Sequence, residues 1–335
     1  MRSKTAASVP SSVERKNWPI KRTTLLVLVS AALILTGLGC RGVGAAVDAP
    51  PTPTAVRPTG SFDFSNHVIL LVLENQKYSA IIGNPNAPYL NSLANQYGLA
   101  SEFFADTHPS IGNYMMLTTG QIVTNNLDFS GNINVNNIAR VMGQAGMPWR
   151  AYLEALPAVG YTRDGPYPYA KTHNPFAYLS DIHVFPAQGA NMVPFTEFAT
   201  DLQNNALPPF SYIAPSQLHN MHDCPNGIVG CSNDVKVAAG DAWVKQQLEP
   251  VLNSPSFVSR NVLIIVTWDE SWDSDSQGGG GHIPVILIGP KVKQGFVSTT
   301  TYKHENVLAL VLKYLGLPNT LANADGALPM DEFLQ

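Results

Sequence analysis

The stretch His67-Val-Ile-Leu-Leu-Val-Leu-Glu-Asn75 is an apolar run that stops at a carboxylate and an amide, and Asn261-Val-Leu-Ile-Ile-Val-Thr-Trp-Asp-Glu270 is a second run that stops at two carboxylates. Short apolar runs without polar alternation are typical of strands buried on both faces of a parallel sheet. Ligand-binding groups of such sheets gather beyond the carboxyl ends of the strands. The two runs therefore predict an α/β fold, with a mostly parallel central sheet and helices on both faces, that can bring four oxygen-bearing side chains to one crevice: Glu74, Asn75, Asp269 and Glu270.

Composition and charge limit the number of domains and the kinds of partner. The chain has 335 residues, 45% of them hydrophobic, which suits one large core and a single α/β domain. Its formal net charge is −4; residues 1–39 contain six basic residues and one acidic residue, which leaves −9 for residues 40–335. Because affinity for nucleic acid comes from basic patches, we expect no nucleic-acid partner.

The N-terminus has the layout of a secretory signal. Basic residues precede an uncharged apolar stretch from Thr23 to Gly39. We therefore expect a signal peptide over 1–39, a Pro- and Thr-rich tether over 40–61 and a folded domain over 62–335. The domain is then extracytoplasmic, secreted or anchored to the outer face of the cell membrane, and any membrane association goes through an N-terminal lipid or anchor.

The end of the leader allows three interpretations. Gly37-Leu-Gly-Cys40 resembles the lipobox of bacterial lipoproteins, with Gly where Leu is usual, and predicts lipidation of Cys40. A cut after Ala45 is the alternative. An uncleaved anchor is the third, although the stretch falls short of the roughly 20 apolar residues that span a bilayer. The lipidated form is slightly favoured.

The other two cysteines support export. Cys224 and Cys231 are close enough in sequence to close a small loop, and an oxidising compartment favours a disulfide bond between them. The alternative is two free buried thiols. The spacing and the lack of further cysteines exclude a CxxC-type metal site.

Apolar spacing and turn residues predict the other elements. The segment 157–186 is rich in aromatic residues and proline, and it predicts long loops over the site. Beyond the two opening runs, we predict strands over 149–153, 210–214 and 283–288, and helices over 87–98, 111–119, 138–146, 235–252 and 305–315.

The residues at the ends of the two opening runs suit a metal ion. Carboxylate and amide oxygens are hard ligands that suit Mg, Ca or Mn and tolerate Zn. The adjacent acids Asp269 and Glu270 repel each other unless a cation or a basic group lies between them. The alternatives are a helix N-cap by Asn75 and exposed loop acids.

Ser110 is the candidate nucleophile. It stands in His108-Pro-Ser-Ile-Gly-Asn-Tyr114, where a helix is predicted to begin. The free N–H groups and the positive dipole of a helix N-terminus favour an alkoxide and stabilise a bound phosphate. Simple N-capping is the alternative. The chain lacks the G-x-S-x-G nucleophile elbow, which argues against a serine esterase.

Histidines in loops are candidate proton donors. His173 and His222 follow or flank predicted strands, and His282 ends a glycine-rich loop. If the connection after Glu270 folds back as a hairpin, His282 returns beside Asp269, and glycines permit a close approach of the backbone to a ligand. The remaining histidines that flank predicted elements, His304 among them, are left out of the candidate site.

Eight short motifs occur in order between Phe62 and Leu317: VLENQ, APYLNSLA, THPSIGNYMMLTTG, HNPF, NMHD, GDAW, TWDES and GGGGHIP. Each is weak alone, but their order is specific. Together they resemble the bacterial phosphoesterase family of secreted acid phosphatases and phospholipases C, which is related to the alkaline phosphatase superfamily. The likeness is strongest to the short secreted acid phosphatases, and it covers essentially the whole predicted domain.

The resemblance implies roles for the residues in these motifs. Ser110 is implied to be the nucleophile and, with the four oxygen ligands, to hold a divalent metal. Gly112 stands where relatives commonly have Pro, which removes no reacting atom. Four histidines are implied to surround the phosphate, two as substrate-binding residues and two as catalytic residues of which one protonates the departing alcohol: His108 and His173, then His222 and His282.

The predicted function is a secreted, metal-dependent acid phosphatase that hydrolyses phosphate monoesters through a phosphoserine intermediate. One alternative is a phosphodiesterase of the phospholipase C type, although longer members of that type carry an additional C-terminal region and this chain ends at Gln335. The other alternative is a surface module that binds an anion without hydrolysing it.

Overall fold

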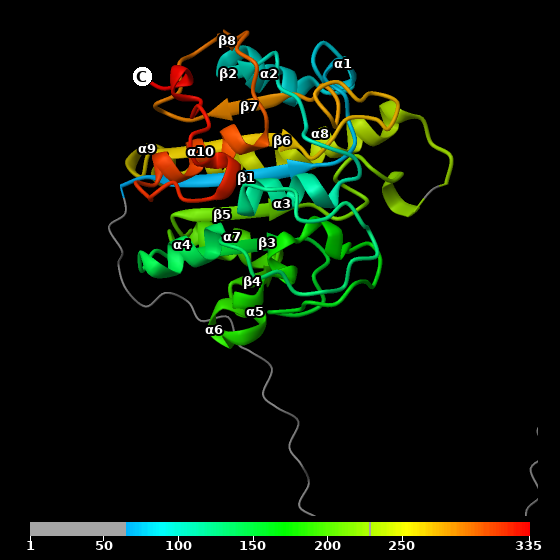
Figure 1. Cartoon of the computed structure of the whole chain (residues 1–335). Helices are drawn as coiled ribbons and strands as arrows, with labels where there is room; N and C mark the ends of the chain where they lie inside the picture. Colours follow the sequence, from blue (N-terminus) through cyan, green and yellow to red (C-terminus); the bar gives the residue numbers. More distant parts are fainter. Residues whose placement is uncertain (1–64, 228) are drawn as a thin grey trace, which may run out of the picture. The chain divides into compact units, whose positions relative to one another are not determined.

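The computed structural model describes residues 65–227 and 229–335 of the chain (Figure 1). The predicted signal peptide, the lipidation site Cys40 and the tether up to residue 61 lie outside the described residues. In the described part, one sheet of eight strands runs in the order β4-β3-β5-β1-β6-β7-β2-β8. The strands are β1 (His67–Leu73), β2 (Gly98–Ala100), β3 (Trp149–Leu153), β4 (Met192–Pro194), β5 (Phe210–Ala214), β6 (Val262–Trp268), β7 (Val285–Ile288) and β8 (Phe296–Ser298).

The predicted α/β architecture is confirmed. β7 runs antiparallel to its neighbours β6 and β2, and the other neighbouring pairs are parallel. Figure 1 shows α3 and α10 in front of the central strands and α8 behind them. The helices are α1 (Tyr78–Ile81), α2 (Pro88–Gln96), α3 (Ile111–Thr119), α4 (Ile138–Gln144), α5 (Ser180–Val184), α6 (Pro186–Gly189), α7 (Thr196–Gln203), α8 (Asn233–Leu252), α9 (Pro255–Ser259) and α10 (His304–Tyr314).

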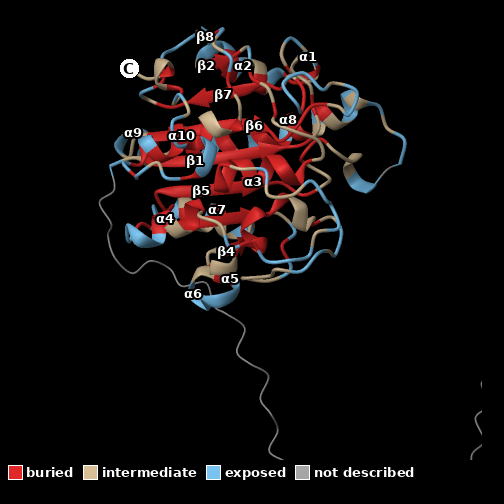
Figure 2. Ribbon diagram, viewed as in Figure 1, coloured by how far each residue is buried: buried red, intermediate tan, exposed pale blue. Residues whose placement is uncertain are grey.

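The two opening runs form the adjacent central strands β1 and β6. Their last residues, Leu73 and Trp268, pair with each other, and the Asp269 N–H donates to the Leu73 carbonyl at 3.0 Å. Every residue of both strands is buried (Figure 2), and such burial stabilises a fold by about 25 cal/mol per Å² of apolar surface. Because the register fixes where both strands end, Glu74 and Asp269 begin their loops at the same edge of the sheet.

Several element boundaries differ from the sequence prediction. The strand predicted over 283–288 begins at Val285, because Pro284 has no N–H to donate to a neighbouring strand. The helix predicted over 87–98 ends at Gln96, because Gly98 opens β2. Strands β2, β4 and β8 have three residues each, which is too few for a periodic pattern. The helices α1, α5, α6, α7 and α9 were also not predicted.

The long loops that we predicted over 157–186 are confirmed only for residues 157–170, which contain no helix or strand, whereas the rest of the segment is mostly helical. It contains the 3-10 helices Lys171–His173 and Pro175–Tyr178 and the helix α5. Phe176 is fully buried and stacks on Trp149, with ring centroids 4.7 Å apart. Packing of these aromatic rings against the sheet, rather than a local apolar period, sets the conformation of the segment.

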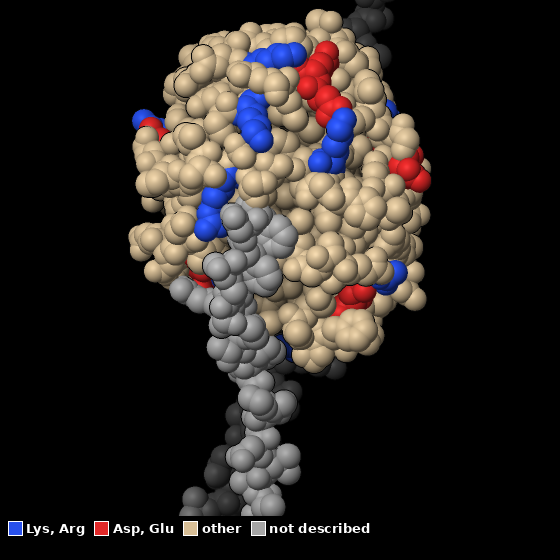
Figure 3. Space-filling view, turned by 90° about the vertical axis from the view of Figure 1, so that its left-hand side faces the viewer, with Lys and Arg blue, Asp and Glu red and all other residues tan. Residues whose placement is uncertain are grey.

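Three further observations concern the predicted disulfide bond, membrane association and nucleic-acid binding. Cys224 and Cys231 form the predicted disulfide bond. Among the residues that the structure describes, none belongs to a helix long and apolar enough to cross a membrane. On the face shown in Figure 3, basic and acidic side chains are few and intermixed. The expectation that nucleic acid is not a partner stays a prediction.

Candidate active site

The loop after β1 and the loop after β6 are joined at the sheet edge by Asn75. Its φ is 48°, in the left-handed region that Asn tolerates better than most residues. In this conformation the Asn75 N–H donates to Asp269 Oδ1 at 3.1 Å, and its side-chain amide donates to Glu270 Oε1 at 3.2 Å. The four predicted oxygen ligands therefore lie together, as the two runs indicated.

Three of these ligands are buried carboxylates. Glu74, Asp269 and Glu270 are 1%, 0% and 2% exposed. Burial, and then the nearby Glu74 and Glu270, raise the pKa of Asp269 well above its ordinary value. Burial and Glu74 also raise the pKa of Glu270, although His108 opposes this. Burial works against the ionisation of Glu74, but His173, His222 and Tyr114 together hold its pKa below the ordinary value.

Ser110 lies among these carboxylates at the start of α3. Its hydroxyl donates to Glu270 Oε1 at 3.0 Å and lies 3.5 Å from Glu74 Oε2. The Ser110 side chain makes no capping hydrogen bond to the helix, so its hydroxyl does not serve as an N-cap. Tyr114, one turn later on the same helix, donates its hydroxyl to Glu74 Oε1 at 2.7 Å.

His108 and His173 contact the carboxylates. His108 Nδ1 is 2.8 Å from Glu270 Oε2, and its Nε2 donates to the Asp275 carbonyl at 2.9 Å. Burial works against protonation of His108, but the Asp275 carbonyl and Glu270 raise its pKa. His173 Nε2 is 2.9 Å from Glu74 Oε1. Both were predicted to bind the substrate phosphate, and that contact stays a prediction.

The two histidines that we predicted as proton donors have different surroundings in the structure. His222 is partly exposed, its Nδ1 is 2.8 Å from Asp223 Oδ1, and its charge acts on Glu74. The connection after β6 does fold back as a hairpin, but the His282 ring stacks between Tyr78 and Phe104 and its Nε2 donates to a backbone carbonyl at 2.7 Å. No described hydrogen bond joins His282 to Ser110 or to the four oxygen ligands.

Asp106 and His304 connect two segments of the site, and neither residue was predicted to belong to it. His304 is fully buried; its Nδ1 is 3.0 Å from Asp106 Oδ2, and its Nε2 donates to the Trp268 carbonyl at 2.9 Å. One imidazole thus ties the segment that leads to Ser110 to the last residue of β6. His304 and Asp106 are 198 residues apart in the chain, so no local motif could have indicated this contact.

The glycine run before His282 packs against the same segment. A Cβ at Gly280 would lie 2.3 Å from the Thr107 carbonyl oxygen and 2.8 Å from the Thr107 nitrogen. The Gly280 N–H donates to the Ala105 carbonyl at 2.9 Å. Only a residue without a side chain allows the backbone to approach the 105–107 segment this closely.

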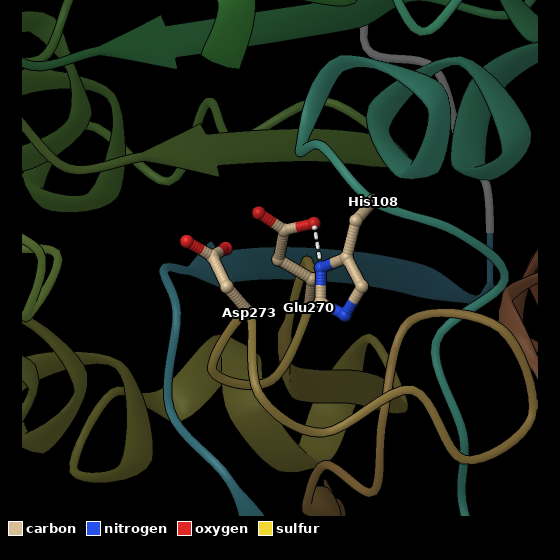
Figure 4. A group of neighbouring side chains, drawn as sticks. All are labelled: His108, Glu270 and Asp273. Atoms are coloured by element: carbon tan, nitrogen blue, oxygen red, sulfur yellow. Dashed lines mark hydrogen bonds and ion pairs between the residues drawn. The ribbon is translucent and has the colours of Figure 1, made fainter.

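The donor set fits a divalent cation. Asn75 Oδ1 and Asp269 Oδ2 are buried and have no hydrogen-bond partner in the described part of the chain. Buried oxygens without donors are costly unless a cation contacts them. In addition, His108, Glu270 and the exposed Asp273 offer ligand atoms that lie within 4.8 Å of one another, and Figure 4 shows Glu270 between the other two.

Comparison with known proteins decides the family. The profile of the Phosphoesterase family matches residues 84–318. The chain belongs to the Phosphoesterase family. A phosphatidylinositol-3-phosphatase from Mycobacterium tuberculosis is 32% identical to this phosphoesterase over 257 residues, which cover 76% of the chain and 78% of that protein. A phosphate-repressible acid phosphatase from Penicillium chrysogenum is 28% identical over 322 residues, 90% of the chain and 72% of that protein.

These relatives confirm the predicted enzyme class. The phosphoesterase is a phosphoric ester hydrolase with phosphatase activity, and its substrate is a phosphate ester. A solved structure of a protein in the alkaline phosphatase superfamily from Vibrio parahaemolyticus shares the fold, with a TM-score of 0.55 at 15% identity over 80% of this chain and 71% of that one. The predicted alkaline phosphatase-like fold is confirmed.

The close packing of the glycine run predicts a stability loss. Gly280→Ala should lower the free energy of unfolding by about 1–3 kcal/mol, because the added methyl overlaps the Thr107 backbone. Urea unfolding measures the change. Gly143→Ala in α4 is the control, since its Cβ would meet only the end of the Gln188 side chain at 3.4 Å. Equal stability of the two variants would contradict the packing argument.

A pH dependence follows from the acid next to His304. Burial, and then Asp106, raise the pKa of Glu305 to about 7 from an ordinary value of 4.5. The folded state therefore holds a proton that the unfolded state releases, so this group removes stability as the pH rises from 4.5 through 7. Glu305→Gln should lose less stability than the wild type between pH 5 and pH 8.

Thermal unfolding across this pH range tests the Glu305 prediction. Glu249→Gln, at an exposed position of α8, serves as the control and should follow the wild type. Parallel curves for Glu305→Gln and the wild type would show that Glu305 does not carry the effect.

Proposed function

We propose that this phosphoesterase is a secreted or surface-anchored acid phosphatase that hydrolyses phosphate monoesters, depends on a divalent metal and forms a phosphoserine at Ser110. The observation that carries the proposal is the position of the Ser110 hydroxyl. It is free of any capping role, lies 3.0 Å from Glu270 Oε1, and shares its cluster with two buried oxygens that have no described partner.

Two steps follow from this arrangement. The Ser110 oxygen attacks phosphorus in line, the bond from phosphorus to the alcohol oxygen breaks, and water then releases phosphate from the serine. A divalent cation held by Glu74, Asn75, Ser110, Asp269 and Glu270 would neutralise the carboxylates, favour loss of the serine proton and stabilise the charge that develops on the phosphoryl group.

The histidines have distinct roles in this proposal. His222 is partly exposed and bound to Asp223, which orients its ring, so it can deliver a proton to the departing alcohol. His108 and His173 hold Glu270 and Glu74 in place and offset part of their charge. His282 is the weaker candidate for the acid, because its ring is stacked between two aromatic side chains and bonded to a carbonyl.

Three observations support the choice of substrate and of compartment. By name, the Mycobacterium tuberculosis relative is a phosphatidylinositol-3-phosphatase, and the Penicillium chrysogenum relative is a phosphate-repressible acid phosphatase. Disulfide bonds persist in oxidising compartments, and Cys224 and Cys231 form one. The secretory pattern of the N-terminal residues points the same way.

The nucleophile prediction is tested by substitution and trapping. Ser110→Ala should lower the turnover of an aryl phosphate by roughly a thousand-fold or more, because no attacking oxygen remains. Acid quenching during turnover, followed by peptide mass spectrometry, should find phosphate on Ser110 of the wild type. Ser92→Ala, on a helix away from the site, should retain full activity. Full turnover by Ser110→Ala, or phosphate trapped on another residue, would contradict the mechanism.

Metal dependence is tested by removal and return of the ion. After chelation, with metal loss verified by elemental analysis, activity should fall to the background rate and return when Mg, Ca, Mn or Zn is added singly. Glu270→Gln should not recover under any of these ions, because it loses a charged ligand. A metal-free protein that keeps its full activity would refute the metal assignment.

A further inference from the structure

A cavity of about 510 Å³ is lined by residues from the segments 127–132, 162–164 and 171–183. Its lining includes Phe129, Arg163, Asp164, Lys171 and Tyr178. The volume lies within the range of about 300–1,000 Å³ that is typical of small-molecule sites. None of these residues has a role in the proposed phosphoryl transfer.

Two residues that line the cavity lie on segments that also reach the centre. Lys171 shares a single 3-10 helix with His173, whose Nε2 is 2.9 Å from Glu74 Oε1. Tyr178 packs in one hydrophobic cluster with Ile111, the residue that follows Ser110. Two lining residues of the cavity therefore belong to segments that contact the centre, one next to the carboxylates and one next to the helix that begins after Ser110.

Lys171 presents a positive charge to this cavity. Its ammonium lies over the Tyr178 ring, 4.1 Å from the centroid, and the side chain is partly buried. Burial lowers the pKa of Lys171. Among the described residues, no carboxylate lies within 4 Å of its Nζ; the charge of Asp164 acts on the ammonium from farther away, and the close contact is the one with the Tyr178 ring.

The acidic side chains of the cavity do not neutralise this ammonium directly. Asp164 is exposed, and its Oδ1 accepts a hydrogen bond from the Lys171 backbone N–H at 3.0 Å rather than from the ammonium. Asp128 is also exposed. Arg163 lines the same cavity and adds a second cation. A partly desolvated ammonium without an ion-pair partner is stabilised when an anion enters beside it.

We propose that this cavity is a subsite for the alcohol part of the substrate, and that Lys171 selects phosphate monoesters whose alcohol carries a second anionic group, a carboxylate or a further phosphate. The inference rests on the proposed phosphomonoesterase function. The scissile phosphate is bound at the Ser110 centre, and the second anion lies in the cavity next to Lys171. Tyr178 fixes the ammonium in position, so little side-chain entropy is lost when the anion binds.

Two substrates with the same carbon skeleton test the proposal. 3-Phosphoglycerate carries a carboxylate where glycerol 3-phosphate carries a hydroxymethyl group. Lys171→Met should lower kcat/KM for 3-phosphoglycerate at least about tenfold, because a hydrogen bond between charged groups is lost, and should leave kcat/KM for glycerol 3-phosphate within about twofold of the wild type. Lys171→Arg keeps the charge and should retain most of the preference.

The control is Lys245→Met, which removes an exposed lysine of α8 outside the cavity and should leave both substrates unaffected. If the wild type hydrolyses both esters and Lys171→Met changes them equally or not at all, the subsite is wrong while the phosphatase function stands. The subsite is also wrong if the wild type hydrolyses only glycerol 3-phosphate. If the wild type hydrolyses neither ester nor an aryl phosphate, the proposed function itself fails, and the subsite with it.

Discussion

Three carboxylates buried at one edge of the sheet are the constraint around which the site is built. Glu74, Asp269 and Glu270 are almost fully removed from water, and their mutual repulsion raises the pKa of Asp269 well above its ordinary value, in addition to the effect of burial. Such a cluster is costly unless protons or a cation compensate it. His108 and His173 offset part of the charge, and two buried oxygens remain without a described donor. A divalent cation would compensate the remaining negative charge and contact the two buried oxygens.

The sheet and its supports bring these acids together despite their repulsion. β1 and β6 end in register, so the acids that follow them begin at one level. The hydrogen bond from the Asp269 N–H to the Leu73 carbonyl extends the pairing by one step. The His304 ring is hydrogen-bonded to the Trp268 carbonyl and to Asp106, which stands four residues before Ser110. The nucleophile and the carboxylates are thus held by the same framework, which fixes their distances before any substrate arrives.

The sequence predicted the parts of this site that have a local pattern. The two apolar runs identify β1 and β6, and the acids at their ends follow from the sheet rule. Ser110 was found because a helix begins after it. The long-range contacts were not predictable: Tyr114 reaches Glu74 and His304 reaches Asp106 only in the folded chain. His282 was predicted at the site from the hairpin and from the family resemblance; the hairpin forms, the pattern could not show that the ring stacks on Tyr78 and Phe104, and its catalytic role stays a prediction.

The central claim is that a cation compensates the buried carboxylates, and Asp269→Asn tests it most directly. Asparagine keeps an oxygen to accept the Asn75 N–H but removes one of the repelling charges. Thermal unfolding of the metal-free proteins at neutral pH should show that Asp269→Asn is more stable than the wild type, and saturating divalent cation should stabilise the wild type strongly and the variant little. A metal-free variant less stable than the wild type, together with a wild type that does not respond to any divalent cation, would contradict the account.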